Sequence, residues 1–138
     1  MTGPRPRLVV DGSVLVALVA DGGDAAAWAD RQVAGKSLVA PHLAVFEAAN
    51  VLRRQAQAGR LDPTVAALAH ADLLALPIQL WPYEPLADRC WALRQNLTAY
   101  DAAYVALAEL LGATLVTLDR RLAAAPGPRC PVLAPVPA

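Results

Sequence analysis

The sequence lacks an excess of charge of either sign. Its 138 residues include 12 lysine and arginine side chains and 12 aspartate and glutamate side chains, so the formal net charge is zero. General attraction to nucleic acid or to an anionic membrane is therefore excluded, and any polyanion must be held by local contacts. Lysine itself is almost absent, since Lys36 is the only one. The acidic residues consequently have few lysine partners to pair with.

Cysteine is scarce too. Cys90 and Cys130 lie far apart and form no Cys-x-x-Cys pair, which argues against a zinc site. Two distant cysteines without a pairing pattern are typical of a reducing compartment. We expect both thiols to be free and buried.

Long hydrophobic runs are also missing. Arg5 and Arg7 followed by the apolar residues 8–20 imitate the start of a secretory signal, but Asp11 and Gly12 interrupt the run too early. No run approaches the roughly 20 apolar residues that span a bilayer. The sequence therefore predicts a soluble, cytoplasmic protein without membrane contact.

What the sequence does contain is an alternation of short β-branched runs and longer helical stretches. The predicted strands are residues 8–10, 37–40, 78–81, 113–117 and a weak 132–133. The predicted helices are residues 13–20, 25–34, 41–59, 63–76, 84–95, 98–111 and 120–124. Strands separated by helices predict an α/β fold, with a parallel sheet of four to five short strands flanked by helices on both faces. We expect one domain over 1–138, with its core at about 7–133 and a loosely ordered proline-rich tail.

Four carboxylates stand at the ends of buried strands or in the first turns of helices. They are Asp11, Glu47, Asp101 and Asp119. Helices in such a sheet run antiparallel to the strands, so helix starts gather at the edge where the strands end. The topology therefore predicts that the four acids meet at one edge.

Each acid, taken singly, also has an ordinary structural role. Asp11 and Asp119 suit helix N-caps, and Thr98-x-x-Asp101 is similar to a capping box. Glu47 shares its helix face with polar residues and suits a solvated surface. The helix that carries Asp101 is apolar nearly all round, however, so a charge at its start needs a partner. Clustered carboxylates without lysine have raised pKa values or bind a hard divalent cation, and oxygen ligands favour Mg²⁺ or Mn²⁺ over zinc.

The segments around these acids resemble the PIN-domain family, in particular the VapC-type ribonuclease toxins of type II toxin–antitoxin pairs. The resemblance covers nearly the whole chain and is carried by residues 9–15, 46–52, 97–108 and 115–122. Each segment holds one acid, and all four stand in the family's order and spacing. Gly12 departs from the other small residues that are common at its position.

The resemblance implies a metal-dependent endoribonuclease that hydrolyses RNA phosphodiester bonds with Mg²⁺ or Mn²⁺. Asp11 and Asp101 are expected as direct metal ligands, with Glu47 and Asp119 completing the site. The residues expected to support the site are Ser13, Asn50 and Thr117, and those that suit RNA phosphates are Arg53, Arg54, Arg120 and Arg121. The resemblance also implies a VapB-like antitoxin and a homodimer. One alternative remains: a PIN-like module that binds RNA or protein without cleaving it.

Aromatic residues are few, at 5% of the chain. Trp28, Trp81 and Trp91 are able to stack on bases, but a tryptophan embedded in an apolar pattern is more often part of the core. We therefore expect core positions for all three.

Overall fold

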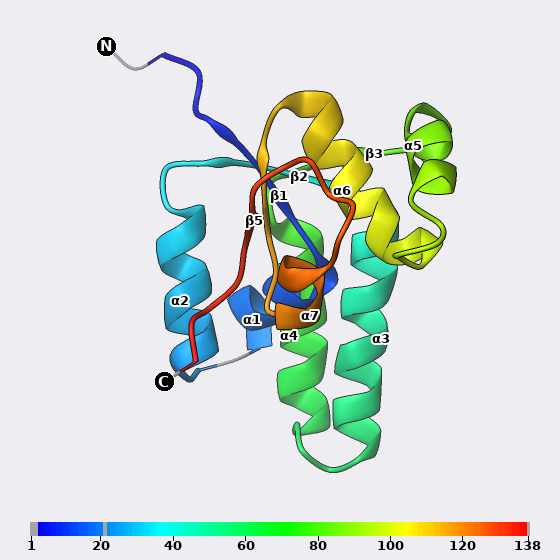
Figure 1. Ribbon diagram of the computed structural model, residues 1–138. Coiled ribbons are helices and arrows are strands. Elements are labelled where there is room, and N and C mark those ends of the chain that lie inside the picture. The colour runs from blue at the N-terminus through cyan, green and yellow to red at the C-terminus, as the bar shows by residue number, and fades with distance from the viewer. Residues whose placement is uncertain (1–2, 21, 138) are drawn as a thin grey trace.

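The computed structural model describes residues 3–20 and 22–137, and that part of the chain forms one five-stranded parallel sheet (Figure 1). The strands are β1 (Arg7–Val10), β2 (Ser37–Pro41), β3 (Ile78–Trp81), β4 (Thr114–Val116) and β5 (Val132–Leu133). Their order across the sheet is β3-β2-β1-β4-β5, and all neighbours run parallel. The α/β fold and its parallel sheet are thus confirmed.

The helices lie close to their predicted positions. They are α1 (Gly12–Ala20), α2 (Asp24–Val33), α3 (Leu43–Gln57), α4 (Pro63–Ala75), α5 (Ala87–Ala92), α6 (Ala99–Leu111) and α7 (Arg120–Ala124), with a 3₁₀ turn η1 (Glu84–Leu86) before α5. The prediction of one helix over residues 84–95 was wrong, because the segment divides into η1 and α5. Pro41 does not begin a helix either. It pairs with Trp81 at the end of β2, and α3 starts two residues later.

The sheet has a switch point beside its first strand. β1 pairs with β2 on one side and with β4 on the other, so the chain leaves β1 in one direction and later returns on the opposite flank. In open α/β sheets, ligands bind in the crevice outside the carboxyl ends of the strands at such a point. Asp11 directly follows β1, and Thr117 directly follows β4.

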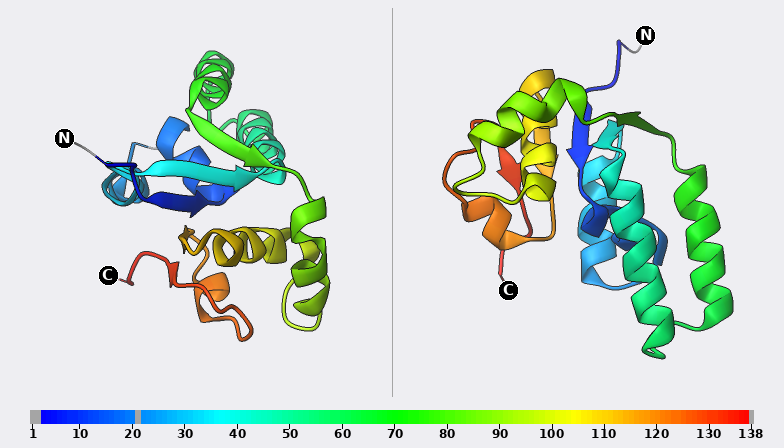
Figure 2. Two further views of the ribbon diagram at one scale, coloured as in Figure 1. Left: turned by 90° about the horizontal axis from the view of Figure 1, so that it is seen from above. Right: turned by 90° about the vertical axis from the view of Figure 1, so that its right-hand side faces the viewer.

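Helix α6 is the most deeply buried helix of the fold. It packs against β1, β2 and β4, and residues 102–108 are all buried. Thr98 caps its start by accepting a hydrogen bond from the backbone N–H of Asp101 (3.1 Å), and Gly112 ends it in the left-handed conformation. Figure 2 shows α6 on one side of β1, β2 and β3, with α3 and α4 on the other. Helices α1, α3 and α4 pack on one another.

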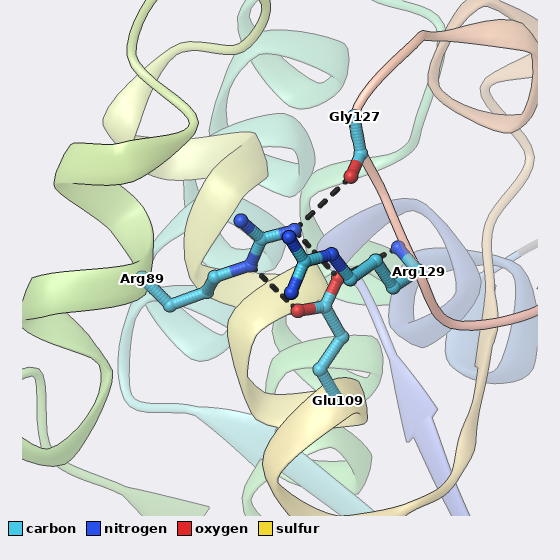
Figure 3. A network of polar contacts seen from close by, with 4 residues as sticks. All are labelled: Arg89, Glu109, Gly127 and Arg129. Atoms are coloured by element: carbon cyan, nitrogen blue, oxygen red, sulfur yellow. Dashed lines mark hydrogen bonds and ion pairs between the residues drawn. The ribbon is translucent and has the colours of Figure 1, made fainter.

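The proline-rich C-terminal segment is held to the domain, which corrects the expectation of a loose tail. β5 pairs with β4, and the Glu109 carboxylate on α6 accepts a hydrogen bond from the backbone N–H of Arg129 (2.7 Å). The same carboxylate binds the Arg89 guanidinium from α5 at 2.6 Å and 3.2 Å, and Arg89 also donates to the carbonyl oxygen of Gly127 (Figure 3). The Glu109 carboxylate thus joins α6, α5 and the C-terminal segment.

The expectations for cysteine and tryptophan are met in part. Both cysteines are free, but only Cys90 is buried, since Cys130 is partly exposed. Trp28 and Trp81 pack against the core, whereas Trp91 is 68% exposed and lies under the Arg94 guanidinium. Among the helices of the described residues, none has the length and apolar character to cross a membrane.

Candidate functional site

Asp11 is the buried centre of the candidate site. It is 8% exposed, and Thr117 beside it is fully buried. Its Oδ1 atom accepts hydrogen bonds from the Ser13 hydroxyl (2.6 Å) and the Val14 backbone N–H (3.2 Å), and its Oδ2 atom accepts one from the Thr117 hydroxyl. A carboxylate has about four lone-pair positions, so one position of Oδ2 stays open for a further ligand.

A short chain of hydrogen bonds ties the ends of β1 and β4 together around this carboxylate. The Ser13 oxygen accepts from the Leu118 backbone N–H (3.1 Å), and the Thr117 oxygen accepts from the Asp119 backbone N–H (2.9 Å). Both hydroxyls therefore contact Asp11 while fixing the loop after β4. The Ser13 and Thr117 hydroxyls thus support the Asp11 carboxylate and also bind backbone N–H groups after the end of β4.

Glu47 reaches the site from the second turn of α3. Its Oε1 atom accepts a hydrogen bond from the Tyr104 hydroxyl on α6, and the Tyr104 side chain is 1% exposed. Glu47 also lies against the start of α1, because a Cβ atom built on Gly12 would stand 2.9 Å from the Glu47 Cβ. Such a distance is shorter than real Cβ contacts allow. Gly12 therefore lets α1 and α3 approach closely enough to set Glu47 beside Asp11.

Asp101 lies in the first turn of α6 and is partly exposed. Its backbone N–H is occupied by the Thr98 cap, and its carboxylate stands in the electric field of the other acids. Burial raises the pKa of Asp101, and the charges of Asp119 and Asp11 raise it further, whereas Arg121 lowers it. The carboxylate is thus within electrostatic reach of three other charged side chains.

Asp119 is the N-cap of α7. Its Oδ1 atom accepts from the Arg121 backbone N–H (2.9 Å), and the Arg121 Nε atom stands 3.5 Å from the same oxygen. Lysine is scarce in the chain, and it is an arginine that gives Asp119 a basic partner. Arg121 is 95% exposed at its side chain, so the pair is solvated and weak. Its guanidinium is free to turn toward an incoming anion.

The pKa of Glu47 responds to its acidic neighbours, whereas that of Asp11 responds to burial and hydrogen bonds. Burial raises the pKa of Glu47, which the charges of Asp11 and Asp101 raise further against the effect of the Tyr104 hydrogen bond. Burial also raises the pKa of Asp11, although its hydrogen bonds from Ser13 and Thr117 oppose this. Mutual repulsion of this kind appears only when carboxylates share a site, and raised values are typical of functional clusters.

The remaining predicted residues have other contacts or are exposed. Asn50 is exposed on α3 and accepts a hydrogen bond from Arg53 (2.9 Å), which also donates to Gln57 (2.9 Å). Arg54 lies one helical turn after Asn50 and lines a hollow together with Arg60. Arg120 is exposed at the start of α7. Of the four arginines, Arg121 alone acts on an acid of the site in the described structure.

The donor set fits a hard divalent cation. All four side chains offer oxygen, and the three with raised pKa values are relieved by positive charge. In the part of the chain that the structure describes, no three acidic, histidine or cysteine side chains are drawn together into a ready metal cage. Mg²⁺ does not require one, since it keeps several waters and is often held by one or two carboxylates and a substrate phosphate.

Sequence reasoning missed Tyr104 and the packing role of Gly12. Tyr104 lies three residues after Asp101, on the same face of α6, so its spacing was a usable signal for a side chain that enters the site. Its hydroxyl fixes the direction of the Glu47 carboxylate. For Gly12 the sequence offers no comparable signal, because the steric need arises from α3.

Comparison with known proteins agrees with this geometry. The model of the PIN domain family matches residues 8–128. The curated Ribonuclease VapC9 of Mycobacterium tuberculosis is 41% identical over 126 residues, which cover 91% of this chain and 95% of that relative. The family-model match spans all four acids and, apart from the first residue of β1, every described strand except β5.

Solved structures repeat the fold. Protein PAE2754 from Pyrobaculum aerophilum superposes with a TM-score of 0.69 at 32% identity, covering 92% of this chain and 83% of that one. The VapC20 toxin of Mycobacterium tuberculosis gives a TM-score of 0.65 at 21% identity, covering 85% and 93%, and supports the fold alone. With the sheet order, the carboxylates at the switch point and a family match over most of the sequence in agreement, this chain belongs to the PIN-domain family, among the relatives of the VapC ribonucleases.

Proposed function

We propose that this protein is a Mg²⁺- or Mn²⁺-dependent endoribonuclease and the toxin of a toxin–antitoxin pair. The observation that carries the proposal is the set of carboxylates at the switch point, where the charge of the buried Asp11 raises the pKa values of Glu47 and Asp101. Relatives named VapC ribonucleases, at 41% identity over nearly the whole chain, support RNA as the substrate. Cellular RNA is found in the cytoplasm, where we place the protein.

Asp11 and Asp101 are the side chains that would hold the cation, with Glu47 and Asp119 completing its surroundings. When bound, such a cation neutralises the scissile phosphate and makes a water molecule more acidic. Glu47, whose carboxylate is directed by the Tyr104 hydroxyl, would complete the cation's surroundings or accept a proton from an attacking water. Arg121 is placed to neutralise a phosphate oxygen.

The test is cleavage of total cellular RNA with Mg²⁺ or Mn²⁺, followed by mapping of the RNA ends. Asp101→Asn should abolish cleavage while the protein stays folded, because the amide removes one negative ligand at nearly equal volume. Asp72→Asn, an exposed acid on α4, is the matched control and should cleave normally. Undiminished cleavage by the Asp101→Asn protein would sink the mechanism. Chelation by EDTA should stop the wild-type reaction.

An antitoxin has a suitable place next to the acids. A groove of about 490 Å³ runs between α1 and α3 and is lined by Ser13, Val16, Val51 and Leu118 among others. Ser13 and Leu118 are also part of the hydrogen bonds around Asp11, so a partner segment in this groove would lie beside the site. Expression of the chain alone should inhibit bacterial growth, and coexpression of the neighbouring reading frame should relieve it. Harmless expression of an active nuclease would count against the toxin role.

We also propose a homodimer. Helix α4 exposes Val65 and Leu68, which are neighbours on one face, at 47% and 63%, an apolar surface that suits a second copy. Sedimentation should give twice the monomer mass, and Leu68→Glu should give the monomer. A monomeric wild-type protein would contradict this part of the proposal.

The non-catalytic alternative makes the opposite prediction. A binding module would hold RNA or protein equally well after Asp101→Asn and would show no metal-dependent cleavage in any variant. The intact set of four acids favours the nuclease.

A further inference from the structure

A small apolar pocket opens at the first turn of α6, the turn that also carries Asp101. It has a volume of about 220 Å³ and lies between the ends of β2 and β3, the η1 turn and the first turns of α3 and α6. Its walls include Leu43, Trp81, Tyr83 and Tyr100. Tyr83 and Tyr100 are 52% and 63% exposed, which is unusual for rings that border a cavity.

We propose that this pocket holds one unstacked nucleobase of the RNA substrate, stacked on Tyr100 and Tyr83 next to the cleaved bond. The inference rests on the proposed ribonuclease function and identifies a specificity pocket for it. Single-stranded RNA is recognised through bases that are splayed out and stacked on aromatic side chains. The pocket, at about 220 Å³, has room for one heterocyclic ring system.

The chemistry of the walls favours a base over a phosphate. No aspartate, glutamate, lysine or arginine lines the pocket, and its surface is almost wholly apolar. An anion would therefore lose its hydration there, with the His42 imidazole as its one nitrogen-bearing partner besides the Trp81 indole among the lining side chains. A neutral aromatic ring loses little, and it gains contact with two tyrosine faces.

The pocket and the acids share their supporting elements. Tyr100 directly precedes Asp101, so their Cα atoms are about 3.8 Å apart. Leu43 lies one helical turn before Glu47 on α3, or about 6 Å along the axis. A base is joined to its phosphate through one ribose. A base in the pocket would therefore bring the neighbouring phosphate to the carboxylates.

The indole of Trp81 forms part of the pocket wall. Its Nε1 atom is buried and has no hydrogen-bond partner among the described residues. A base carries ring and carbonyl acceptors that would supply this bond if the indole turned its Nε1 atom toward the pocket. The net charge of zero points the same way, because RNA affinity must then come from local contacts such as stacking.

The test measures binding of a fluorescent single-stranded RNA hexamer of mixed sequence in EDTA, where no metal-dependent cleavage occurs. Tyr100→Ala should weaken binding by about 5- to 100-fold, the loss expected for one stacked base, and Tyr100→Phe should bind like the wild type. Trp91→Ala is the matched control, because Trp91 is an equally exposed aromatic residue that does not line the pocket. It should also bind like the wild type.

Cleavage with Mg²⁺ completes the test and separates the two proposals. Tyr100→Ala should raise KM by a similar factor and leave kcat within about threefold, while Asp101→Asn removes kcat. If the wild type cleaves RNA and Tyr100→Ala binds and cleaves like it, the base pocket is refuted and the ribonuclease stands. If the wild type neither cleaves nor binds RNA, both fail. Loss of a dimer in Tyr100→Ala with unchanged RNA affinity would assign the pocket to a second copy and overturn the inference.

Discussion

Gly12→Ala should lower catalysis about tenfold in a protein that still folds. The new Cβ atom would lie 2.9 Å from the Glu47 Cβ, with the Ala44 carbonyl oxygen and the Ala48 backbone nitrogen at 3.4 Å. Ordinary contact begins at about 3.4 Å, so α3 and α1 must separate by about 0.5 Å or more. Backbone atoms on two sides leave no flexible side chain to absorb this shift, and Glu47 must move.

The expected magnitudes follow from that displacement. Overpacking destabilises by about 1–3 kcal/mol, and replacement of glycine by alanine at a helix start restores up to about 1 kcal/mol. The net loss of about 0–2 kcal/mol corresponds to a fall of no more than about 10 °C in Tm for a domain of this size. Misplacement of a catalytic group by about 1 Å costs on the order of 100-fold in rate, so a shift of half that size should cost about tenfold.

The assay compares kcat/KM for RNA cleavage with thermal unfolding in the same preparations. Gly3→Ala is the control, because a Cβ atom at Gly3 meets nothing within 4 Å. It should change neither quantity. A folded Gly12→Ala protein with wild-type kcat/KM would refute the reasoning, since it would mean that the position of Glu47 is not set by this contact.

Three further predictions concern the side chains that hold the acids and the domain. Tyr104→Phe keeps the buried ring but removes the donor to Glu47, so kcat should fall about tenfold or more with little change in Tm, and unchanged kcat would contradict a positioning role. Thr117→Val removes the donor to Asp11 and the acceptor for the Asp119 N–H, and should lower stability by about 2–5 kcal/mol in chemical denaturation, whereas Thr117→Ser should lose less than half of that. Glu109 has a pKa below its usual value, because its bonds from Arg89 and the Arg129 backbone outweigh burial. Its contribution to stability is therefore present above about pH 4.5 and lost as pH falls through the lower folded value, so Glu109→Gln should lower Tm at pH 7, and the difference from the wild type should shrink as the pH falls below 4.5; a loss independent of pH would exclude the ionic contribution.

The sequence was sufficient to predict the sheet and the edge at which the acids gather. Short β-branched runs that end in Asp11 or Thr117 mark strands, and parallel pairing then brings their ends together whatever the details of packing. The first and last residues of helices and strands were less predictable where contacts with other segments decide them. Pro41 has the character of a helix start, yet its pairing with Trp81 extends β2 and delays α3.

Contacts between side chains from distant segments were beyond the sequence. Glu109 lies on the outer face of a helix whose pattern indicates only burial, and nothing local announces that it binds Arg89, twenty residues earlier, and the backbone of the C-terminal segment. The same holds for Arg121, whose pairing with Asp119 depends on the local turn into α7. Hydrogen bonds of this kind depend on three-dimensional approach, which periodicity does not encode.

Capping and metal binding were weighed as competing roles for the acids, and the structure makes them compatible. Asp11 caps α1 through Oδ1, and Asp119 caps α7 through Oδ1, which leaves open lone pairs on Oδ2 in both. Each cap fixes the carboxylate against its own helix, so the second oxygen is held in a defined direction before any ligand arrives.

This double role decides how Asp119 must be tested. Asp119→Ala removes the cap as well as the charge, so a loss of activity would not distinguish a displaced loop from a missing ligand. Asp119→Asn keeps an acceptor for the Arg121 N–H and removes only the charge. If Asp119 contributes to metal binding, the asparagine variant should keep the wild-type Tm without metal, and it should require several-fold more Mg²⁺ for half-maximal cleavage. An unchanged Mg²⁺ requirement in a folded Asp119→Asn protein, beside a loss of Tm in Asp119→Ala, would reduce Asp119 to a helix cap.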